Sequence, residues 1–166
     1  SIGEATRFAK KMTGRDANKM AYVLFADSAL RLKYPTHYQV KTTTQIDTLH
    51  ALSVQTIKGF IETEDHDTAT WFNGIVDITI FDKMQEITTR DNDESTESLK
   101  VKITYNDYPN TLFSGQTNVV DGLFEFTFMV PKDIRYNYGN GRIAYYAYDT
   151  EAKEEGIGHF EDFVIG

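Results

Sequence analysis

Short strand-like segments separated by turn-forming clusters run through most of this 166-residue chain, and they constrain its fold more than any other feature. The segments either alternate apolar and polar residues or run continuously apolar, as β-strands do. Clusters of Asp, Asn, Gly and Pro lie between them, and these residues favour tight turns. The pattern predicts strands at residues 37–40, 52–60, 74–81, 99–105, 122–130, 142–148 and 160–164.

About seven short strands with no helical periodicity between them predict an all-β domain, and an antiparallel immunoglobulin-like β-sandwich is the architecture we expect. A β-barrel is the alternative, which the uneven loop lengths disfavour. Apolar residues make up 40% of the chain and aromatic residues 13%, enough to build a core. Gly139-Asn140-Gly141 is expected to form a hairpin turn, because no strand–loop–helix pattern surrounds it that would make it a phosphate-binding loop.

The first 35 residues have a different pattern. Apolar residues recur there at helical spacing, at Ile2, Ala5, Phe8, Ala9 and Met12, and Gly14 is expected to end the helix. Residues 20–25 are a continuous apolar run, typical of a strand buried on both faces of a parallel sheet. One helix and one strand do not make a sheet. We therefore interpret residues 1–35 as a helix–strand remnant, the C-terminal edge of an upstream α/β domain, and residues 36–166 as the β-sandwich. The start at Ser1 rather than Met agrees with an origin in a longer protein.

Composition excludes several functions. The net charge is -8 and the basic residues are scattered, whereas a nucleic-acid-binding protein needs a basic face. No apolar stretch approaches the roughly 20 residues of a transmembrane helix, so we expect no membrane span. The chain has no cysteine, which removes disulfides, thiolate nucleophiles and cysteine-bound zinc.

Residues 25–35, Phe25-Ala26-Asp27-Ser28-Ala29-Leu30-Arg31-Leu32-Lys33-Tyr34-Pro35, resemble the segment that ends the catalytic domain of gingipain-like cysteine peptidases. That family has Gly and Pro where this chain has Ala26 and Ser28. A helix containing Gly-Glu-Ala precedes the family's segment and is matched here by Gly3-Glu4-Ala5. Residues 72–76, 81–83, 130–134 and 141–147 resemble the β-domain that follows the catalytic domain in the type IX secretion (Por secretion) sortases of Bacteroidetes.

The resemblance implies a parent protein that is a cysteine endopeptidase acting as a sortase. It would remove C-terminal sorting signals from cargo at the outer-membrane surface of a Gram-negative bacterium and link the cargo to a surface anchor. The family's catalytic His and Cys lie upstream of the matched segment, and no residue here corresponds to either. The resemblance thus implies a non-catalytic fragment with no cofactor. Its partners would be the upstream catalytic domain of the same chain and other surface proteins of the secretion system.

The residues themselves offer no catalytic constellation. Neither Ser53 nor Ser114 lies in a Gly-x-Ser-x-Gly elbow, so both are interpreted as ordinary strand and turn serines. A zinc site needs closely spaced ligands, and the four histidines do not have that spacing. They are His37, His50, His66 and His159. A metal-dependent hydrolase therefore ranks last among the functions considered.

Residues 62–67 form the one segment whose carboxylates are close enough in sequence to suggest a metal site. Glu62, Glu64 and Asp67 are candidate calcium ligands, because calcium takes six to eight oxygens. The segment lacks the Gly and the distal Glu of an EF-hand loop, and acidic runs are more often solvated loops. The same applies to Asp91, Asp93 and Glu94.

Aromatic residues offer a second binding hypothesis. A carbohydrate groove would need several exposed rings, and its candidates are Trp71, Phe72, Tyr136, Tyr138, Tyr145, Tyr146 and Tyr148. Tyr145 and Tyr146 must point to opposite faces of a strand, so one row at most is exposed. Core packing is the competing interpretation. Two functions remain: an accessory, interaction or stabilising domain of a cell-surface peptidase, or a free-standing surface module that binds carbohydrate or protein.

Overall fold

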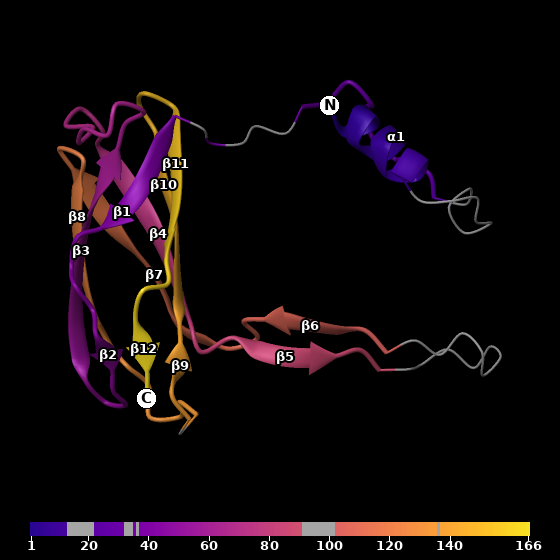
Figure 1. The fold of residues 1–166 in the computed structure, drawn as a ribbon. Coiled ribbons are helices and arrows are strands. Elements are labelled where there is room, and N and C mark those ends of the chain that lie inside the picture. The colour runs from indigo at the N-terminus through magenta and orange to yellow at the C-terminus, as the bar shows by residue number, and fades with distance from the viewer. Residues whose placement is uncertain (13–21, 32–34, 36, 91–101, 136) are drawn as a thin grey trace. The chain divides into compact units, whose positions relative to one another are not determined.

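A computed structural model describes residues 1–12, 22–31, 35, 37–90, 102–135 and 137–166 (Figure 1). The chain divides into two compact units, Ser1–Tyr34 and Pro35–Gly166. In the described residues, no helix has the length and apolar character that crossing a membrane requires.

The first unit contains the predicted helix, α1 (Ile2–Met12). Ser1 caps it, because the Glu4 N–H donates to the Ser1 hydroxyl at 3.3 Å. Backbone hydrogen bonds join the helix start to the following segment, from Ile2 N to Leu30 O and from Gly3 N to Ser28 O. The strand predicted at residues 20–25 is not formed in its described part, since residues 22–25 pair with no strand. Residues 20 and 21 lie outside the described residues, and so does Gly14, the predicted end of the helix.

The second unit is built from strands, and seven of them form one closed sheet. In chain order these are β1 (Tyr38–Thr42), β3 (Val54–Glu62), β4 (Gly74–Phe81), β7 (Thr111–Val120), β8 (Leu123–Met129), β10 (Arg142–Asp149) and β11 (Glu154–Phe160). A three-stranded sheet contains β2 (Thr48–Leu49), β9 (Gly139–Asn140) and β12 (Val164–Ile165). A two-stranded sheet contains β5 (Gln85–Thr88) and β6 (Thr104–Asp107).

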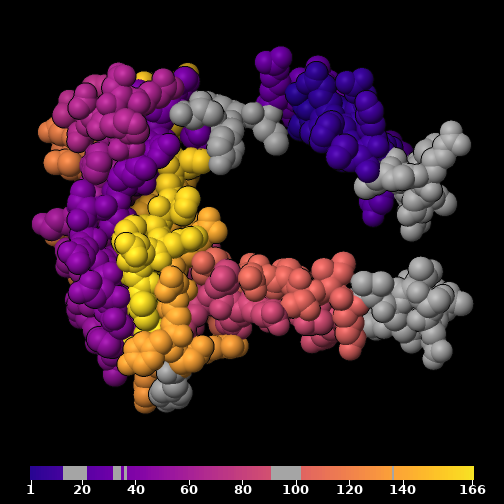
Figure 2. All heavy atoms as spheres, viewed as in Figure 1, coloured from indigo at the N-terminus to yellow at the C-terminus, as the bar shows by residue number. Residues whose placement is uncertain are grey.

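The all-β prediction is confirmed, but the immunoglobulin-like sandwich is not. The strand order β1-β11-β10-β4-β7-β8-β3 closes on itself as a barrel. Closure depends on two short contacts: β1 pairs in parallel with β11 at two positions, and β7 pairs with β8 at two positions. In Figure 2, β1 in purple lies beside β11 in yellow. β1 also pairs with β3, so both of its edges are hydrogen-bonded, one to β11 and one to β3. This double pairing joins the two ends of the strand order and leaves β1 no free edge.

Inward-facing residues of the barrel strands form one core, as the alternation predicts. β8 is the clearest case, since Phe124, Phe126 and Phe128 are buried and the residues between them are exposed. Phe113 of β7 stacks on Phe126 with ring centroids 6.0 Å apart. On the outer face, β3 and β8 carry matched cross-strand pairs, including the Lys58–Glu125 ion pair at 2.8 Å.

Several features of the strand pattern were not predicted, among them the short strands β2 and β5. β7 is largely polar, and only Val119 is fully buried among its residues, so it has no strong apolar alternation. The strand predicted at residues 160–164 is wrong, since Phe160 ends β11 and Val164 begins β12; most of β11 was missed because Gly156 and Gly158 interrupt its apolar pattern. Gly139 and Asn140 are not a hairpin turn but a short strand, β9, which pairs with β12. Of the strand predicted at residues 99–105, residues 99–101 lie outside the described residues.

Asp149, at the end of β10, ties together two parts of the barrel. Its carboxylate accepts hydrogen bonds from the backbone N–H groups of Ala152 (3.0 Å), Glu151 (2.8 Å) and Asn73 (3.2 Å). The first two fix the turn from β10 to β11, and the third fixes the start of β4. The N–H groups of Ala152, Asn73 and Glu151 lower the pKa of Asp149, with burial acting in the opposite direction.

Replacing Asp149 with asparagine should therefore destabilise the barrel in a pH-dependent way. The folded-state pKa is below the unfolded value of about 3.9, so the ionised carboxylate stabilises the fold above that pH, and the effect is lost as pH falls through the folded pKa. We expect D149N to cost about 1–3 kcal/mol at pH 7 and less near pH 3. Urea unfolding of both proteins at the two pH values measures this. An equal cost at both would contradict a role for the charge.

Candidate functional site

The predicted serines take structural positions. Ser53 precedes β3, and its hydroxyl donates to the backbone carbonyl of His50 at 2.6 Å, not to the imidazole ring. The ring Nδ1 of His50 instead lies 2.9 Å from the carbonyl oxygen of Gly166. Ser114 lies on the exposed outer face of β7. These contacts do not assemble a serine–histidine pair.

The candidate calcium ligands have different partners. Glu62 contacts Lys41 and His66, at 3.5 Å in both cases. Glu64 Oε1 lies 2.6 Å from Nδ1 of His37. The described residues contain no group of three or more His, Asp or Glu side chains placed to hold a metal ion. Of the other candidates, His159 is exposed on β11, and Asp91, Asp93 and Glu94 lie outside the described residues.

The aromatic candidates do not form one platform. Phe72 and Tyr145 are core residues. Burial raises the pKa of Tyr145 to about 12, against the effect of its 2.8 Å hydrogen bond with Thr42. Tyr146 lies on the opposite face of β10, as predicted, and its ring packs beside that of Tyr148 with centroids 5.9 Å apart. Tyr138 and Trp71 are exposed on other segments, and Tyr136 lies outside the described residues.

One hollow of the second unit gathers residues from two of the predicted groups, and we call it the acidic–aromatic cleft. It has a volume of about 360 Å³. The start of β1 and the β3–β4 connection line it, through His37, Tyr38, Thr63, Glu64, Asp65, Asp67 and Trp71. The acidic segment and Trp71 were predicted as separate candidates. Only the pairing of β1 with β3 brings His37 and Tyr38 beside them.

The connection that carries the carboxylates has a defined backbone. Thr63 N donates to Asp67 O at 2.8 Å, and His66 N donates to Thr63 O at 3.1 Å. Glu62 and Thr68 form an antiparallel bridge at the base. His66 has φ of 65°, a left-handed conformation that lets the chain reverse here. The Glu64, Asp65 and Asp67 side chains are therefore carried on a hydrogen-bonded turn.

Tyr38 and Trp71 form the aromatic part of the cleft. The Tyr38 ring packs edge-on against buried Phe72, with centroids 5.8 Å apart and an interplanar angle of 65°. The Trp71 indole N–H points to the Tyr38 hydroxyl at 3.4 Å. Burial raises the pKa of Tyr38, and the nearby carboxylates of Glu154 and Glu64 act in the same direction. Tyr38 was not predicted as a site residue, because an aromatic residue within a strand pattern is usually a packing residue.

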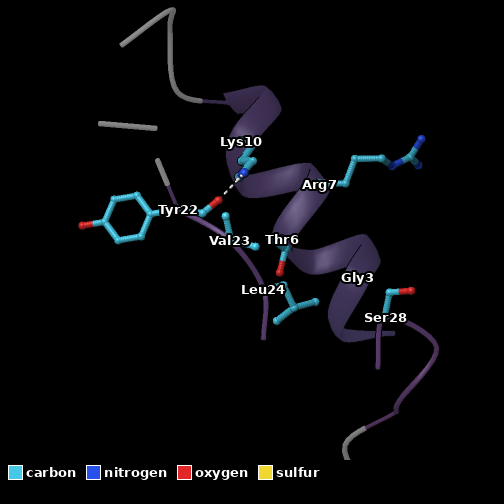
Figure 3. A pocket seen from close by; sticks show the side chains of 8 residues that line it. All are labelled: Gly3, Thr6, Arg7, Lys10, Tyr22, Val23, Leu24 and Ser28. Atoms are coloured by element: carbon cyan, nitrogen blue, oxygen red, sulfur yellow. Dashed lines mark hydrogen bonds between the residues drawn. The ribbon is translucent and has the colours of Figure 1, made fainter. Parts of the chain in front are cut away.

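A second hollow lies within the first unit, between α1 and residues 22–28 (Figure 3). Its volume is about 390 Å³, and it is lined by Gly3, Thr6, Arg7, Lys10, Tyr22, Val23, Leu24 and Ser28. The Lys10 ammonium donates to the Tyr22 carbonyl oxygen across it. No described residue of α1 is buried. Several large apolar side chains of this unit are exposed, above all Phe25 at 96%.

No protein-family model and no curated protein matches the chain. Among solved structures, the whole chain is similar to the crystal structure of dimeric latent PorU from Porphyromonas gingivalis, with 28% sequence identity and a TM-score of 0.65. This chain covers 16% of that chain's length. A structure of Spo0M, a sporulation control protein from Bacillus subtilis, matches 78% of this chain with 12% identity and a TM-score of 0.45. The match covers 49% of the Spo0M chain.

Proposed function

We propose that this chain is a non-catalytic accessory region of a larger PorU-like cysteine peptidase that acts as a type IX secretion sortase. The observation that carries the proposal is the similarity to PorU over the full length of the chain, at 28% identity. The Ser53 hydroxyl and the His50 ring each contact a backbone carbonyl oxygen, and Ser114 lies on the outer face of β7, so these residues occupy structural positions. The site of action would be the outer surface of a Gram-negative bacterium.

The first unit supports a role for residues 1–35 as the edge of an upstream peptidase domain. Phe8, Met12, Val23 and Phe25 are all at least half exposed, although exposing large apolar side chains together is unfavourable for a unit that is complete by itself. The PorU chain extends far beyond the matched part, since the match covers 16% of it. We infer that a sheet outside this chain covers these side chains, and that the barrel buttresses that domain or docks other secretion proteins.

The gene sequence upstream of Ser1 gives the direct test. We expect it to encode a peptidase domain with a catalytic His and Cys. A signal peptide joined directly to Ser1 would contradict the proposal. In that case the free-standing surface module, binding carbohydrate or protein, becomes the better candidate, because the exposed Trp71 beside Tyr38 is suited to ligand contact. Binding to a glycan array that is lost in W71A would identify that function.

Replacing Phe25 with aspartate should have a small effect in this chain and a large one in the proposed parent protein. In the present chain the side chain is exposed, so F25D should change the midpoint of unfolding little. In the parent protein, where Phe25 would face the upstream core, F25D would bury a charge there. We expect the free energy of unfolding to fall by about 3 kcal/mol or more and peptidase activity to be lost. V120D, at an exposed site of β7, is the matched control and should be tolerated in both. A stable, active F25D parent would show that this segment is not the edge of the peptidase core.

A further inference from the structure

We propose that the acidic–aromatic cleft binds a cationic side chain, arginine or lysine, presented by a basic segment of a partner protein. The cleft belongs to the second unit alone, so the proposal does not depend on the accessory role proposed above. It rests on the charges that line the cleft, on the two aromatic rings beside them, and on the contacts that fix the Tyr38 ring and the turn backbone.

The charges favour a cation. Three carboxylates line the cleft, those of Glu64, Asp65 and Asp67, and none of the lining residues is Lys or Arg. Glu64 is paired with His37 at 2.6 Å. In the part of the chain that the structure describes, the Asp65 and Asp67 carboxylates form no ion pair. An anionic ligand would be repelled here, whereas a guanidinium or ammonium group would gain two uncompensated partners.

The aromatic rings favour the same class of ligand. Trp71 is 57% exposed, which leaves much of the indole surface available. Its N–H is directed to the Tyr38 hydroxyl, so the polar edges of the two rings partner each other. The ring faces carry negative electrostatic potential and attract cations, most strongly for Trp. A planar guanidinium also stacks on an indole face. Carboxylates and rings thus select for positive charge together.

The cleft is held before any ligand arrives. Phe72 packs against the Tyr38 ring from the core side, and backbone hydrogen bonds define the Thr63–Asp67 turn that carries the carboxylates. Its volume of about 360 Å³ is near the lower end for ligand pockets, which run from about 300 to 1,000 Å³. That size suits one long side chain. A preorganised site loses less conformational entropy on binding.

Trp71 is the only tryptophan in the chain, so its indole reports on the cleft alone. We would titrate the whole chain with N-acetyl-arginine amide and follow the Trp71 indole N–H resonance by NMR. The matched control ligand is N-acetyl-citrulline amide, which has nearly the same shape without the charge. We expect a saturable shift with arginine, at a dissociation constant near the millimolar range that weakens with added salt, and at least about fivefold weaker binding of citrulline.

Variants then locate the binding. D65N/D67N removes two charges and keeps the backbone bonds of the turn, and we expect about a fivefold or greater loss of arginine affinity. E86Q, at an exposed position of β5, is the control and should bind as the wild type does. Equal shifts with arginine and citrulline, or unchanged affinity of D65N/D67N, would overturn the proposal. So would a shift produced by neutral maltotriose but not by arginine, which would make the cleft a sugar site.

Discussion

Replacing Phe72 with alanine is expected to lower the free energy of unfolding of the barrel by about 3–5 kcal/mol, the usual cost of removing a buried aromatic ring. Phe72 is 0% exposed and packs edge-on against Tyr38. Its backbone N–H donates to Ala69 O and its carbonyl accepts from Gly122 N, both at 2.9 Å, so the backbone cannot easily collapse into the space left. Urea denaturation followed by circular dichroism measures the change.

Trp71 provides the control for Phe72, because it is the adjacent residue and also a large aromatic. W71A removes a side chain that lies mostly on the surface and has one long hydrogen bond, to Tyr38 at 3.4 Å. We expect a loss of about 1 kcal/mol or less. Similar losses for F72A and W71A would contradict the burial assigned to the two rings. The sequence alone presents them as equivalent neighbours.

The second large effect is expected at the Asp82–Lys83 pair, at the end of β4. Both side chains are 2% exposed. The Lys83 ammonium lies 3.2 Å from Asp82 Oδ1 and donates to the carbonyl oxygen of Arg135 at 2.9 Å. Among the described residues Asp82 Oδ1 has no hydrogen-bond partner. The ion pair with Lys83 is therefore the interaction that offsets the cost of burying this oxygen. K83M should cost about 3–5 kcal/mol, because it leaves a buried carboxylate without that partner.

Two further variants separate charge burial from side-chain packing. The double variant D82L/K83M removes both charges and is expected to be neutral or stabilising relative to K83M, because apolar replacements of a buried pair are often tolerated. K58M makes the same change in the exposed Lys58–Glu125 pair and should cost about 1 kcal/mol or less. If K83M and K58M were equally mild, or if D82L/K83M were the worst of the three, the buried pair would not have the role described.

The sequence by itself determined the elements that bury a regular apolar face. The strand predicted at residues 74–81 matches β4, and residues 122–130 and 142–148 contain or nearly match β8 and β10. The helix of the first unit was also predicted from its apolar period, although none of its residues is buried in this chain. In each case the spacing of the apolar residues shows which side chains of one segment lie on the same face. This spacing is set within the segment and does not depend on the element that packs against it.

The tertiary structure decided the rest, because pairing across the sheet has no local signature. The largely polar strand β7 buries only a few of its side chains, among them Val119, and is placed in the sheet by its long pairing with β4. Closure of the barrel depends on which two edges β1 meets. That same placement of β1 sets Tyr38 beside Trp71 and creates the acidic–aromatic cleft. A charged pair such as Asp82–Lys83 is expected at the surface from sequence alone, and only the packing of distant segments, including the Arg135 carbonyl that accepts from Lys83, makes it interior.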